Sequence, residues 1–343
     1  MIRCHTIIIL TALFNLTAGA DTMPTIDAEY PVADLHCDAP MNLIKGKTLT
    51  DKSSHLTIDR LKKGRVALQV FACFVPPTYH RQKAIDYALN MIKLTKTQIS
   101  NHSSQMMLVT DNASWQECQK EKKIGVLLGI EGGHGIGDQA ENLNMFYKEG
   151  VRILTLTWNN SNKFATSGMS AGKTKKDLGL TADGLQLVKL ADTLGVIIDL
   201  SHSSEKTFWD VLKCTKRPPL ASHSCARGLN KKFQFRNLND VQITALAQAG
   251  GIIGINFYPG FLGGKRKPVD INSVADQFEY IKNLAGVECL ALGSDFDGID
   301  EVPKGLEGPD KMPDLLKLLE KRGFTSDEVS KIALGNFIRY MGW

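Results

Sequence analysis

The chain has 343 residues, of which 43% are hydrophobic and 22% are charged, a composition typical of globular enzymes and unlike that of disordered chains. Its formal net charge is only +5, and its basic residues form short, scattered clusters. This distribution argues against a nucleic-acid-binding surface, so we expect no nucleic-acid partner.

The first twenty residues predict a secretory signal peptide. A weakly basic start precedes a mostly apolar stretch over residues 6–16, and the Ala-Gly-Ala that follows fits a small-x-small cleavage site. The apolar stretch is shorter than the ~20 residues of a comfortable membrane span, although an uncleaved anchor is the alternative. We expect residues 1–20 to be removed and residues 21–343 to form one exported domain, periplasmic or extracellular, without a stable membrane span.

Removal of this segment would leave six cysteines with no CxxC pair and no tight spacing. An exported protein can form disulfides, but isolated cysteines in apolar runs are commonly buried thiols. We interpret these six as mostly free packing residues, with a single bridge as the alternative.

Eight short apolar runs predict β-strands, and helical patterns lie between most of them. Strands that are apolar throughout and alternate with helices favour a parallel sheet covered on both faces. Eight repeats over this length favour a single closed (β/α)8 barrel of the TIM type, because no strand is followed by the Gly-rich phosphate loop of an open sheet. The predicted strands are 32–38, 66–74, 124–131, 151–158, 195–202, 220–224, 251–257 and 289–297. The clearest predicted helices are 82–98, 184–193, 205–213, 240–249 and 273–285, with two more within 312–341.

Several predicted strands end at residue types that bind metals. The first ends in His36 and Asp38, which lie two apart on one face and can chelate one ion. The third ends in Glu131, whose two oxygens can bridge two ions and whose buried charge a metal would offset. His202 and His223 close consecutive runs and can hold a second ion. Because the carboxyl ends of barrel strands share one surface, we expect these side chains to form a hydrolytic zinc site.

Each of these residues also has a simpler interpretation. His36 and Asp38 can form a hydrogen-bonded pair, Glu131 can pair with a buried Lys or Arg, and a single histidine is often a core residue. The occurrence of all five at strand ends favours the metal site.

Two further residue types point to catalysis and substrate binding. Asp295 ends the eighth run, where nearby cations would tune its pKa for proton transfer. Asp297 precedes a glycine, so we expect it to cap a turn. Arg236 is a candidate clamp for a substrate carboxylate, because a guanidinium binds carboxylates through two hydrogen bonds.

Across residues 32–341 the chain resembles the membrane dipeptidase (renal dipeptidase) family of zinc metallopeptidases. No single motif is specific, but the complete set in this order is. The matching segments are DLHCD at 34–38, IEGGH at 130–134, RILTLT at 152–157, DLSH at 199–202, SHS at 222–224, RNLND at 236–240, NFY at 256–258 and GSDFDG at 293–298.

This resemblance implies a (β/α)8 barrel that holds two zinc ions and a bridging water or hydroxide. It implies that His36 and Asp38 bind one zinc, that His202 and His223 bind the other, and that Glu131 bridges the two.

The resemblance also implies the remaining roles. Asp295 would take a proton from the nucleophilic water and pass it to the leaving amine. Arg236 would hold the terminal carboxylate of a dipeptide, with Trp158 and Tyr258 as further substrate contacts. The implied substrates are dipeptides, including those with a D-residue on the carboxyl side, and a homodimer is one expected assembly.

The chain departs from the family pattern at two places. Trp158 stands where vertebrate members carry a His, so we expect altered substrate contacts without loss of activity. The interval from SHS to the arginine is longer than usual, which leaves Arg227 as the alternative to Arg236.

Two other functions remain as alternatives. A barrel amidohydrolase acting on cyclic amides usually carries H-x-H on its first strand and often a modified bridging lysine, whereas this chain has His-x-Asp and Glu131. A catalytically silent, peptide-binding barrel is the second, against which the complete set of ligand types argues.

Overall fold

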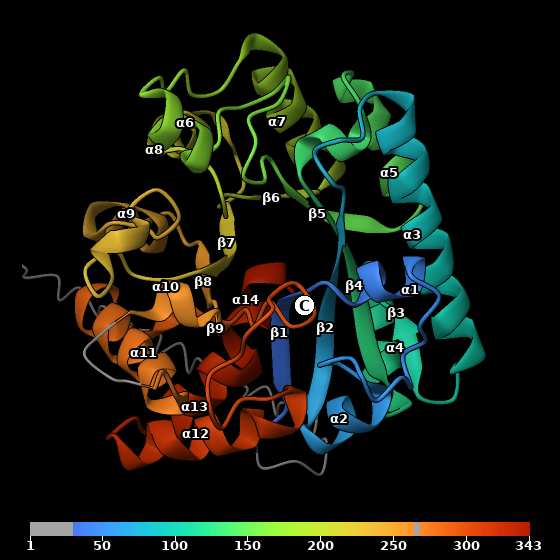
Figure 1. The fold of residues 1–343 in the computed structure, drawn as a ribbon. Helices are drawn as coiled ribbons and strands as arrows, with labels where there is room; N and C mark the ends of the chain where they lie inside the picture. Colours follow the sequence, from blue (N-terminus) through green and yellow to red (C-terminus); the bar gives the residue numbers. More distant parts are fainter. Residues whose placement is uncertain (1–29, 264–267) are drawn as a thin grey trace, which may run out of the picture.

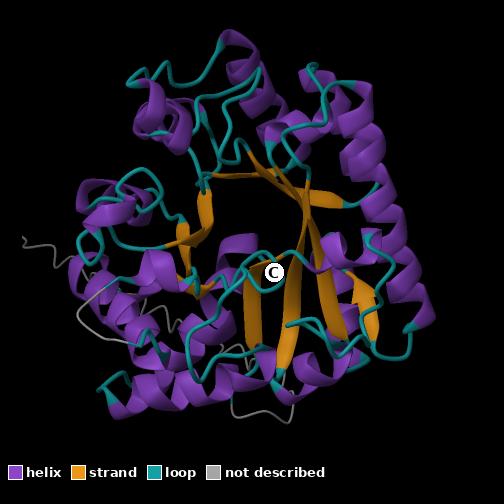
Figure 2. Cartoon of the chain, in the orientation of Figure 1, coloured by secondary structure: helices purple, strands orange, loops and turns teal. Residues whose placement is uncertain are grey.

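The computed structural model describes residues 30–263 and 268–343. Within these residues, eight parallel strands form a closed barrel with helices around it (Figures 1 and 2). The ring closes because β2 pairs with both β1 and β4. The barrel strands are β1 (Val32–Cys37), β2 (Val66–Phe74), β4 (Ile124–Glu131), β5 (Val151–Thr155), β6 (Ile197–Asp199), β7 (Leu220–Ser224), β8 (Ile252–Ile255) and β9 (Leu290–Leu292). The predicted (β/α)8 barrel is confirmed.

A ninth strand, β3 (Met106–Leu108), lies outside the ring. It pairs with the first residues of β4, from Ile124 to Val126, whereas β5 joins β4 only from Leu128 onward. This strand was not predicted, because three residues are too few to show an alternating or continuous apolar pattern.

The helices agree with the sequence pattern where they are long. Side chains of Thr181, Ser204, Asn239, Asp270 and Thr325 cap α7, α8, α9, α11 and α13 by accepting a hydrogen bond from a first-turn backbone N–H, and each such cap stabilises by about 1 kcal/mol.

The sequence analysis did not predict the helices α1, α2, α4, α5, α6 and α10. The helices are α1 (Ala39–Ile44), α2 (Ile58–Lys63), α3 (Gln82–Asn101), α4 (Asn112–Lys120), α5 (Leu143–Lys148), α6 (Gly168–Thr174), α7 (Ala182–Leu194), α8 (Glu205–Cys214), α9 (Asp240–Gln248), α10 (Pro259–Leu262), α11 (Ile271–Ala285), α12 (Met312–Lys321), α13 (Ser326–Ser330) and α14 (Asn336–Met341).

Several strands are shorter at their carboxyl ends than predicted, and this difference has a physical cause. The predicted strand 195–202 is β6, which stops at Asp199, and the predicted strand 289–297 is β9, which stops at Leu292. His202, Asp295 and Asp297 have φ values of 67°, 66° and 65°, a left-handed conformation that no strand contains. The predicted strands 151–158 and 251–257 likewise shorten to β5 and β8, so Trp158 and Tyr258 lie in loops.

The last helix, α14, closes the amino end of the barrel (Figure 1). The side-chain amide of Asn336 donates to the carbonyls of Val287 and Leu290 at the start of β9, and the hydroxyl of Tyr340 donates to Pro218 just before β7. Phe337 is buried in an apolar cluster that contains residues of all eight barrel strands. With that end filled, the carboxyl ends of the strands remain as the place for a site.

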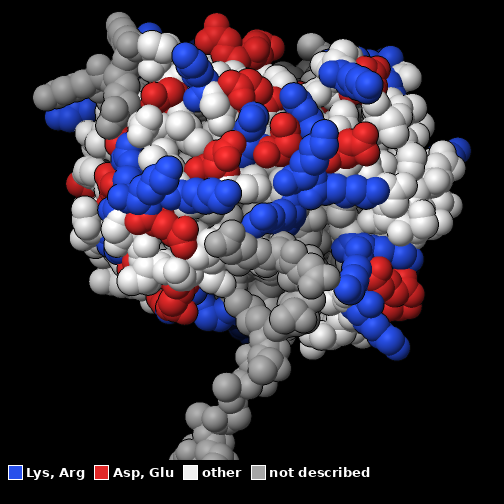
Figure 3. All heavy atoms as spheres, turned by 90° about the horizontal axis from the view of Figure 1, so that it is seen from below, with Lys and Arg blue, Asp and Glu red and all other residues white. Residues whose placement is uncertain are grey.

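No helix in the described part of the chain is long and apolar enough to cross a membrane. The predicted signal peptide lies outside the described residues. The six cysteines within the described residues are all free. On the face shown in Figure 3, basic side chains lie among acidic ones, as expected for solvated surface charge.

Replacing Phe337 by Ala tests the packing at the closed end. The substitution removes a fully buried ring, so we expect the free energy of unfolding to fall by about 3–5 kcal/mol. Chemical denaturation followed by circular dichroism measures this change. Val241→Ala, at an apolar residue that is 67% exposed, is the control and should change it by less than about 0.5 kcal/mol. Equal effects for the two variants would contradict the closing role of α14.

Candidate metal centre and active site

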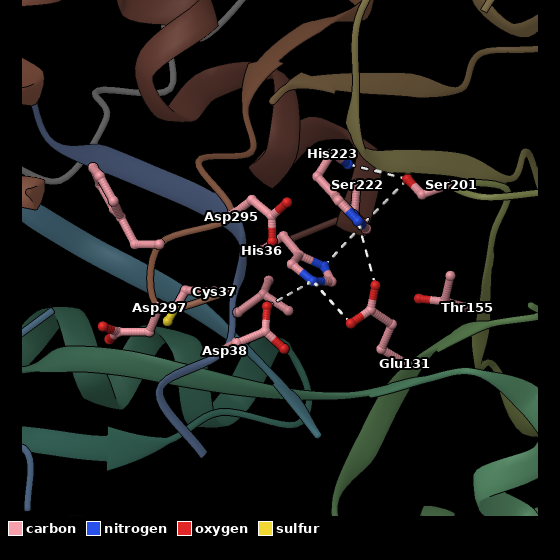
Figure 4. A network of polar contacts seen from close by, with 12 residues as sticks. His36, Cys37, Asp38, Glu131, Thr155, Ser201, Ser222, His223, Asp295 and Asp297 are labelled. Atoms are coloured by element: carbon pink, nitrogen blue, oxygen red, sulfur yellow. Dashed lines mark hydrogen bonds and ion pairs between the residues drawn. The ribbon is translucent and has the colours of Figure 1, made fainter. Parts of the chain in front are cut away.

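The five predicted ligands meet at the carboxyl ends of the strands, around Glu131. Figure 4 shows four of them, His36, Asp38, Glu131 and His223. Its Oε1 lies 3.1 Å from His202 Nε2 and 3.4 Å from His223 Nε2. Its Oε2 lies 3.6 Å from His36 Nε2. The two oxygens of one buried carboxylate therefore face two different sets of donor atoms.

His36 and Asp38 lie side by side, with Nε2 and Oδ2 3.5 Å apart. The prediction placed both on one strand, but β1 ends at Cys37, and Asp38 follows as the residue that precedes α1. Among the described residues, neither His36 Nε2 nor Asp38 Oδ1 has a hydrogen-bond partner, although both are buried. Buried polar atoms without partners are costly and rare, so a bound cation explains them well.

The donor atoms form groups compact enough to hold metal ions. One group comprises Glu131, His202 and His223, and another comprises His36, Asp38 and Asp295, with the ligand atoms of each within 4.8 Å of one another. Imidazole nitrogens together with carboxylate oxygens are a donor set that suits zinc. The residues present therefore fit the metal pair that the sequence implied.

Burial and charge act differently on the three imidazoles. Burial, with a smaller contribution from the Arg236 guanidinium, lowers the pKa of His202 to about 4. Burial, His36 and Arg236 hold the pKa of His223 well below its usual value. Burial also acts to lower the pKa of His36, but the carboxylates of Glu131 and Asp38 outweigh it and raise that pKa well above its usual value.

The carboxylates carry more negative charge than the protein around them offsets. Burial first, and then repulsion from Glu131, raise the pKa of Asp38 well above its usual value. Burial also opposes ionisation of Glu131, yet the neighbouring histidines, with His36 contributing most, hold the pKa of Glu131 well below its usual value. The cluster is thus a place where an added cation is favoured.

Asp295 lies at the edge of the ligand cluster in the loop that follows β9. The side-chain amide of Asn256 donates to its Oδ2 at 2.9 Å. Burial raises the pKa of Asp295, and Glu131 adds to this effect while His36 and Arg236 oppose it. A fixed carboxyl group with a raised pKa is suited to accepting and returning a proton.

Arg236 reaches the site, and the alternative Arg227 does not. The terminal nitrogens of Arg236 donate to the carbonyl of His223 at 2.8 Å and to Ser224 Oγ at 3.3 Å, and one lies 3.2 Å from His202 Nε2. Arg227 instead bonds to the carbonyl of Asn237 and pairs with Glu205. The structure therefore places Arg236 beside the proposed ligands.

A cavity of about 320 Å³ opens onto this cluster. Trp158 lines it, with its ring 4.9 Å from Phe74 and 6.2 Å from His202. Tyr258 lines it too, with its ring 4.7 Å from Phe261. The lining residues are Asp38, Met41, Phe74, Glu131, Trp158, Asn159, His202, Arg236, Tyr258, Phe261, Asp295, Gly298, Ile299 and Asp300.

Two neighbouring residues of the motifs face elsewhere. The Asp297 carboxylate accepts hydrogen bonds from the backbone N–H groups of His55 and Leu56, so it anchors a loop, in keeping with the predicted capping role. Cys37 lies on the side of Asp297, away from Glu131 (Figure 4).

The sequence analysis missed residues that orient the site. Asn159 Oδ1 lies 3.0 Å from His202 Nδ1 and accepts its proton, which leaves Nε2 to face Glu131. Asn256 holds Asp295, as described above. Asn159 directly follows Trp158, and Asn256 begins the NFY segment that matches the family; these were the signals that could have found them.

The comparisons with known proteins agree with this geometry. The profile of the membrane dipeptidase family, peptidase family M19, matches residues 21–342. An uncharacterized dipeptidase of Schizosaccharomyces pombe is 34% identical over 303 residues, which cover 84% of this chain and 71% of that protein.

Solved structures give the same result. The crystal structure of a metallopeptidase called dipeptidase AC, of family M19, has a TM-score of 0.84 at 26% identity, covering 92% of this chain and 98% of that one. A metallopeptidase from Rhodobacter sphaeroides, bound to a phosphinate mimic of the dipeptide L-Ala-D-Ala, has a TM-score of 0.84 at 24% identity over 91% of this chain and 99% of that one. The chain therefore belongs to the membrane dipeptidase family, peptidase family M19, and is a dipeptidase of the metallopeptidase class.

Proposed function

We propose that this dipeptidase uses two zinc ions, one held by His36 and Asp38 and the other by His202 and His223, with Glu131 as the bridge. The observation that carries the proposal is the orientation of Glu131, whose two oxygens face separate donor sets. The partnerless buried atoms of His36 and Asp38 support it. When bound, zinc ions supply Lewis acidity that activates water at neutral pH.

Asp295 is the proposed proton carrier. Its carboxylate lines the cavity and is fixed by Asn256. It accepts a proton from the attacking water and returns it to the amine that leaves when the peptide bond breaks. The raised pKa of Asp295 favours this exchange, because a more basic carboxylate holds the proton longer.

The substrate is proposed to be a dipeptide with its terminal carboxylate toward Arg236. The buried guanidinium lies at the cavity wall and attracts an anion. Trp158 and Tyr258 supply apolar wall for the side chains. The phosphinate mimic bound to the Rhodobacter sphaeroides relative represents L-Ala-D-Ala, which supports acceptance of a D-residue on the carboxyl side.

The cyclic-amide alternative is less well supported. The first strand carries His36 and Asp38 in place of H-x-H, and the bridging position is occupied by a glutamate. The chain's family membership also favours dipeptides.

We also propose that the mature protein is exported after cleavage behind residue 20. The basic, apolar and small-residue regions of the first twenty residues support this. Expression of the full chain followed by mass spectrometry of the secreted product tests it, with Asp21 as the expected amino terminus. Retention of residues 1–20 would contradict the proposal. The homodimer remains an expectation from the family resemblance.

Glu131→Gln and His202→Ala test the bridge and the second donor set. Glu131→Gln removes a proposed ligand without a change in shape, and His202→Ala removes a ring at the barrel rim, away from the apolar core, so both variants should fold. We expect zinc content to fall and hydrolysis of L-Ala-D-Ala to drop by more than the roughly 10–100-fold caused by altering outer-shell partners. Metal analysis and an assay of released amino acids measure both effects.

Matched controls separate these effects from general damage. Glu141→Gln and His80→Ala change the same residue types at exposed positions and should keep wild-type zinc content and turnover. Full activity of Glu131→Gln or His202→Ala would remove that residue from the ligand set.

Asp295→Asn tests the proton carrier. The amide keeps the shape of the side chain but cannot accept the proton, so we expect kcat to fall by about 10²–10⁴-fold. Zinc content should stay unchanged, which distinguishes a proton carrier from a metal ligand. Asp300→Asn, at an exposed carboxylate on the same cavity, is the comparison for a simple loss of charge. An unchanged kcat in Asp295→Asn rules out the role.

Gly298→Ala tests the position of two carboxylates at once. A Cβ at residue 298 would lie 2.5 Å from Asp295 Oδ1 and closer still to Asp38 Oδ2. Because both atoms are ends of side chains, we expect them to shift while the fold persists, with lower zinc affinity and lower turnover. Gly129→Ala, where the nearest atom is 3.6 Å away, is the control. Wild-type zinc binding and turnover in Gly298→Ala would show that these carboxylates are not where the structure places them.

A further inference from the structure

One buried hydroxyl, that of Ser222 in β7, contacts two of the three site histidines. Its Oγ lies 2.7 Å from His223 Nδ1 and 3.2 Å from His36 Nδ1. It also lies 2.6 Å from Asp199 Oδ2 at the end of β6. Under the proposed function, His36 and His223 belong to different zinc ions. Ser222 therefore contacts one ligand from each.

We infer that Ser222 is a positioning residue that fixes the tautomer and orientation of one imidazole in each metal set, and thereby couples the two sets. The inference rests on the proposed function, and it assigns a role to a residue that binds neither metal nor substrate. It follows from the hydrogen-bonding capacity of a hydroxyl, which has one proton to donate and two lone pairs that accept.

The destination of the Ser222 proton is determined by Asp199. The Oδ1 of this carboxylate accepts the backbone N–H groups of Ser201 and Ser222, both at 2.9 Å. Its Oδ2 accepts the hydroxyl of Thr155 at 2.7 Å as well as that of Ser222. A carboxylate surrounded by four donors acts as an acceptor, so the Ser222 proton points to Asp199.

The same contacts exclude Asp199 as a metal ligand. Its oxygens lie near nitrogen atoms of His36 and His223, a grouping compact enough to hold a metal. However, the four donors occupy both oxygens, and the ring nitrogens nearest to Ser222 are the Nδ1 atoms. Asp199 instead holds Ser222 in place by accepting hydrogen bonds from its hydroxyl and its backbone N–H.

Because the Ser222 hydroxyl donates its proton to Asp199, its oxygen can only accept hydrogen bonds from the rings of His223 and His36. His223 and His36 then carry a proton on Nδ1, so Nε2 is the atom of each ring that a metal would take. These are the atoms that face Glu131. A longer contact of 3.4 Å joins the hydroxyls of Ser201 and Ser222, but the Ser201 hydroxyl also has the Ser224 hydroxyl as a partner, at 3.5 Å. The two rings also stack, with centroids 3.7 Å apart, so they are held as a unit.

A second serine in the barrel provides a matched comparison. Ser294 donates its hydroxyl to Asp34 Oδ2 at 2.6 Å and its backbone N–H to Asp34 Oδ1 at 2.8 Å. Ser222 makes the corresponding pair of contacts with Asp199. Both serines are fully buried. The Ser294 hydroxyl also lies 3.3 Å from the backbone carbonyl of His36, but among the described residues it makes no hydrogen bond to a histidine ring nitrogen, so it matches Ser222 in structure without the proposed role.

The experiment measures zinc binding to Ser222→Ala, Ser222→Thr and Ser294→Ala by competition of the metal-free proteins with a chromogenic chelator. We expect Ser222→Ala to weaken binding of both zinc ions by about 10–100-fold, as outer-shell partners of ligating histidines do. Ser222→Thr keeps the hydroxyl and should restore binding. Ser294→Ala should bind both ions as the unaltered protein does.

Other outcomes would overturn the inference. Wild-type affinity in Ser222→Ala, or weakening of one ion alone, contradicts a shared positioning role. An equal loss in Ser294→Ala shows a general effect of removing a buried hydroxyl. If the unaltered protein binds no zinc, the proposed function itself fails. If it binds two ions and Ser222→Ala binds them equally well, only this inference fails.

A measurement on the unaltered protein keeps the inference testable even where a variant fails to fold. Nitrogen NMR of the zinc-loaded protein identifies which ring nitrogen of each histidine carries a proton. We expect Nδ1 to be protonated in both His36 and His223. An unprotonated Nδ1 in either ring overturns the inference.

Discussion

The carboxylate of Glu131, buried at the end of β4, is the charge around which the site is organised. Removing an ionised group from water is expensive unless other charges and hydrogen bonds compensate. Here the compensation comes from imidazoles, and it is incomplete, since atoms of His36 and Asp38 remain without partners. The carboxylates of Glu131 and Asp38 outweigh burial and raise the pKa of His36 well above its usual value, in keeping with a cluster that attracts positive charge. Divalent cations at the same place would supply that charge.

The barrel can hold these buried charges because the part that stabilises the fold is separate from the part that forms the site. Apolar side chains from all eight strands fill the interior together with Leu334 and Phe337 at the amino end, while polar groups gather at the carboxyl end. Between them lies a layer in which Asp34 and Asp199 accept hydrogen bonds from serines and other neighbours. At the carboxyl end, His202 and Asp295 adopt left-handed backbone conformations, as residues at functional sites often do.

The parts of this structure that follow a repeating pattern are the parts that the sequence could predict. The barrel follows from eight apolar runs, and His36, Asp38, Glu131, His202 and His223 were identifiable because polar residues at the ends of such runs are unusual. The ends of β6 and β9 were not predictable, because a left-handed residue other than glycine leaves no compositional sign. The cavity walls were not predictable either, since Phe74 and Ile299 are ordinary apolar residues until folding brings them to the same cavity as Trp158. The links through Asn159 and Ser222 depend on distances between strands, which no single segment contains.

The position of Trp158 shows how such a site can change its substrate contacts without changing its metal chemistry. His202 is held through Nδ1 by Asn159, the residue after Trp158, so the ligand is oriented by the amide and not by the indole. The indole instead packs against Phe74 and faces the cavity. A tryptophan at this position gives the cavity wall an apolar surface without a titratable group, while the hydrogen bond that orients His202 comes from the next residue. Asn159 thus orients the ligand His202, while Trp158 forms part of the cavity wall. The cavity wall can therefore vary while the proposed metal ligands stay fixed.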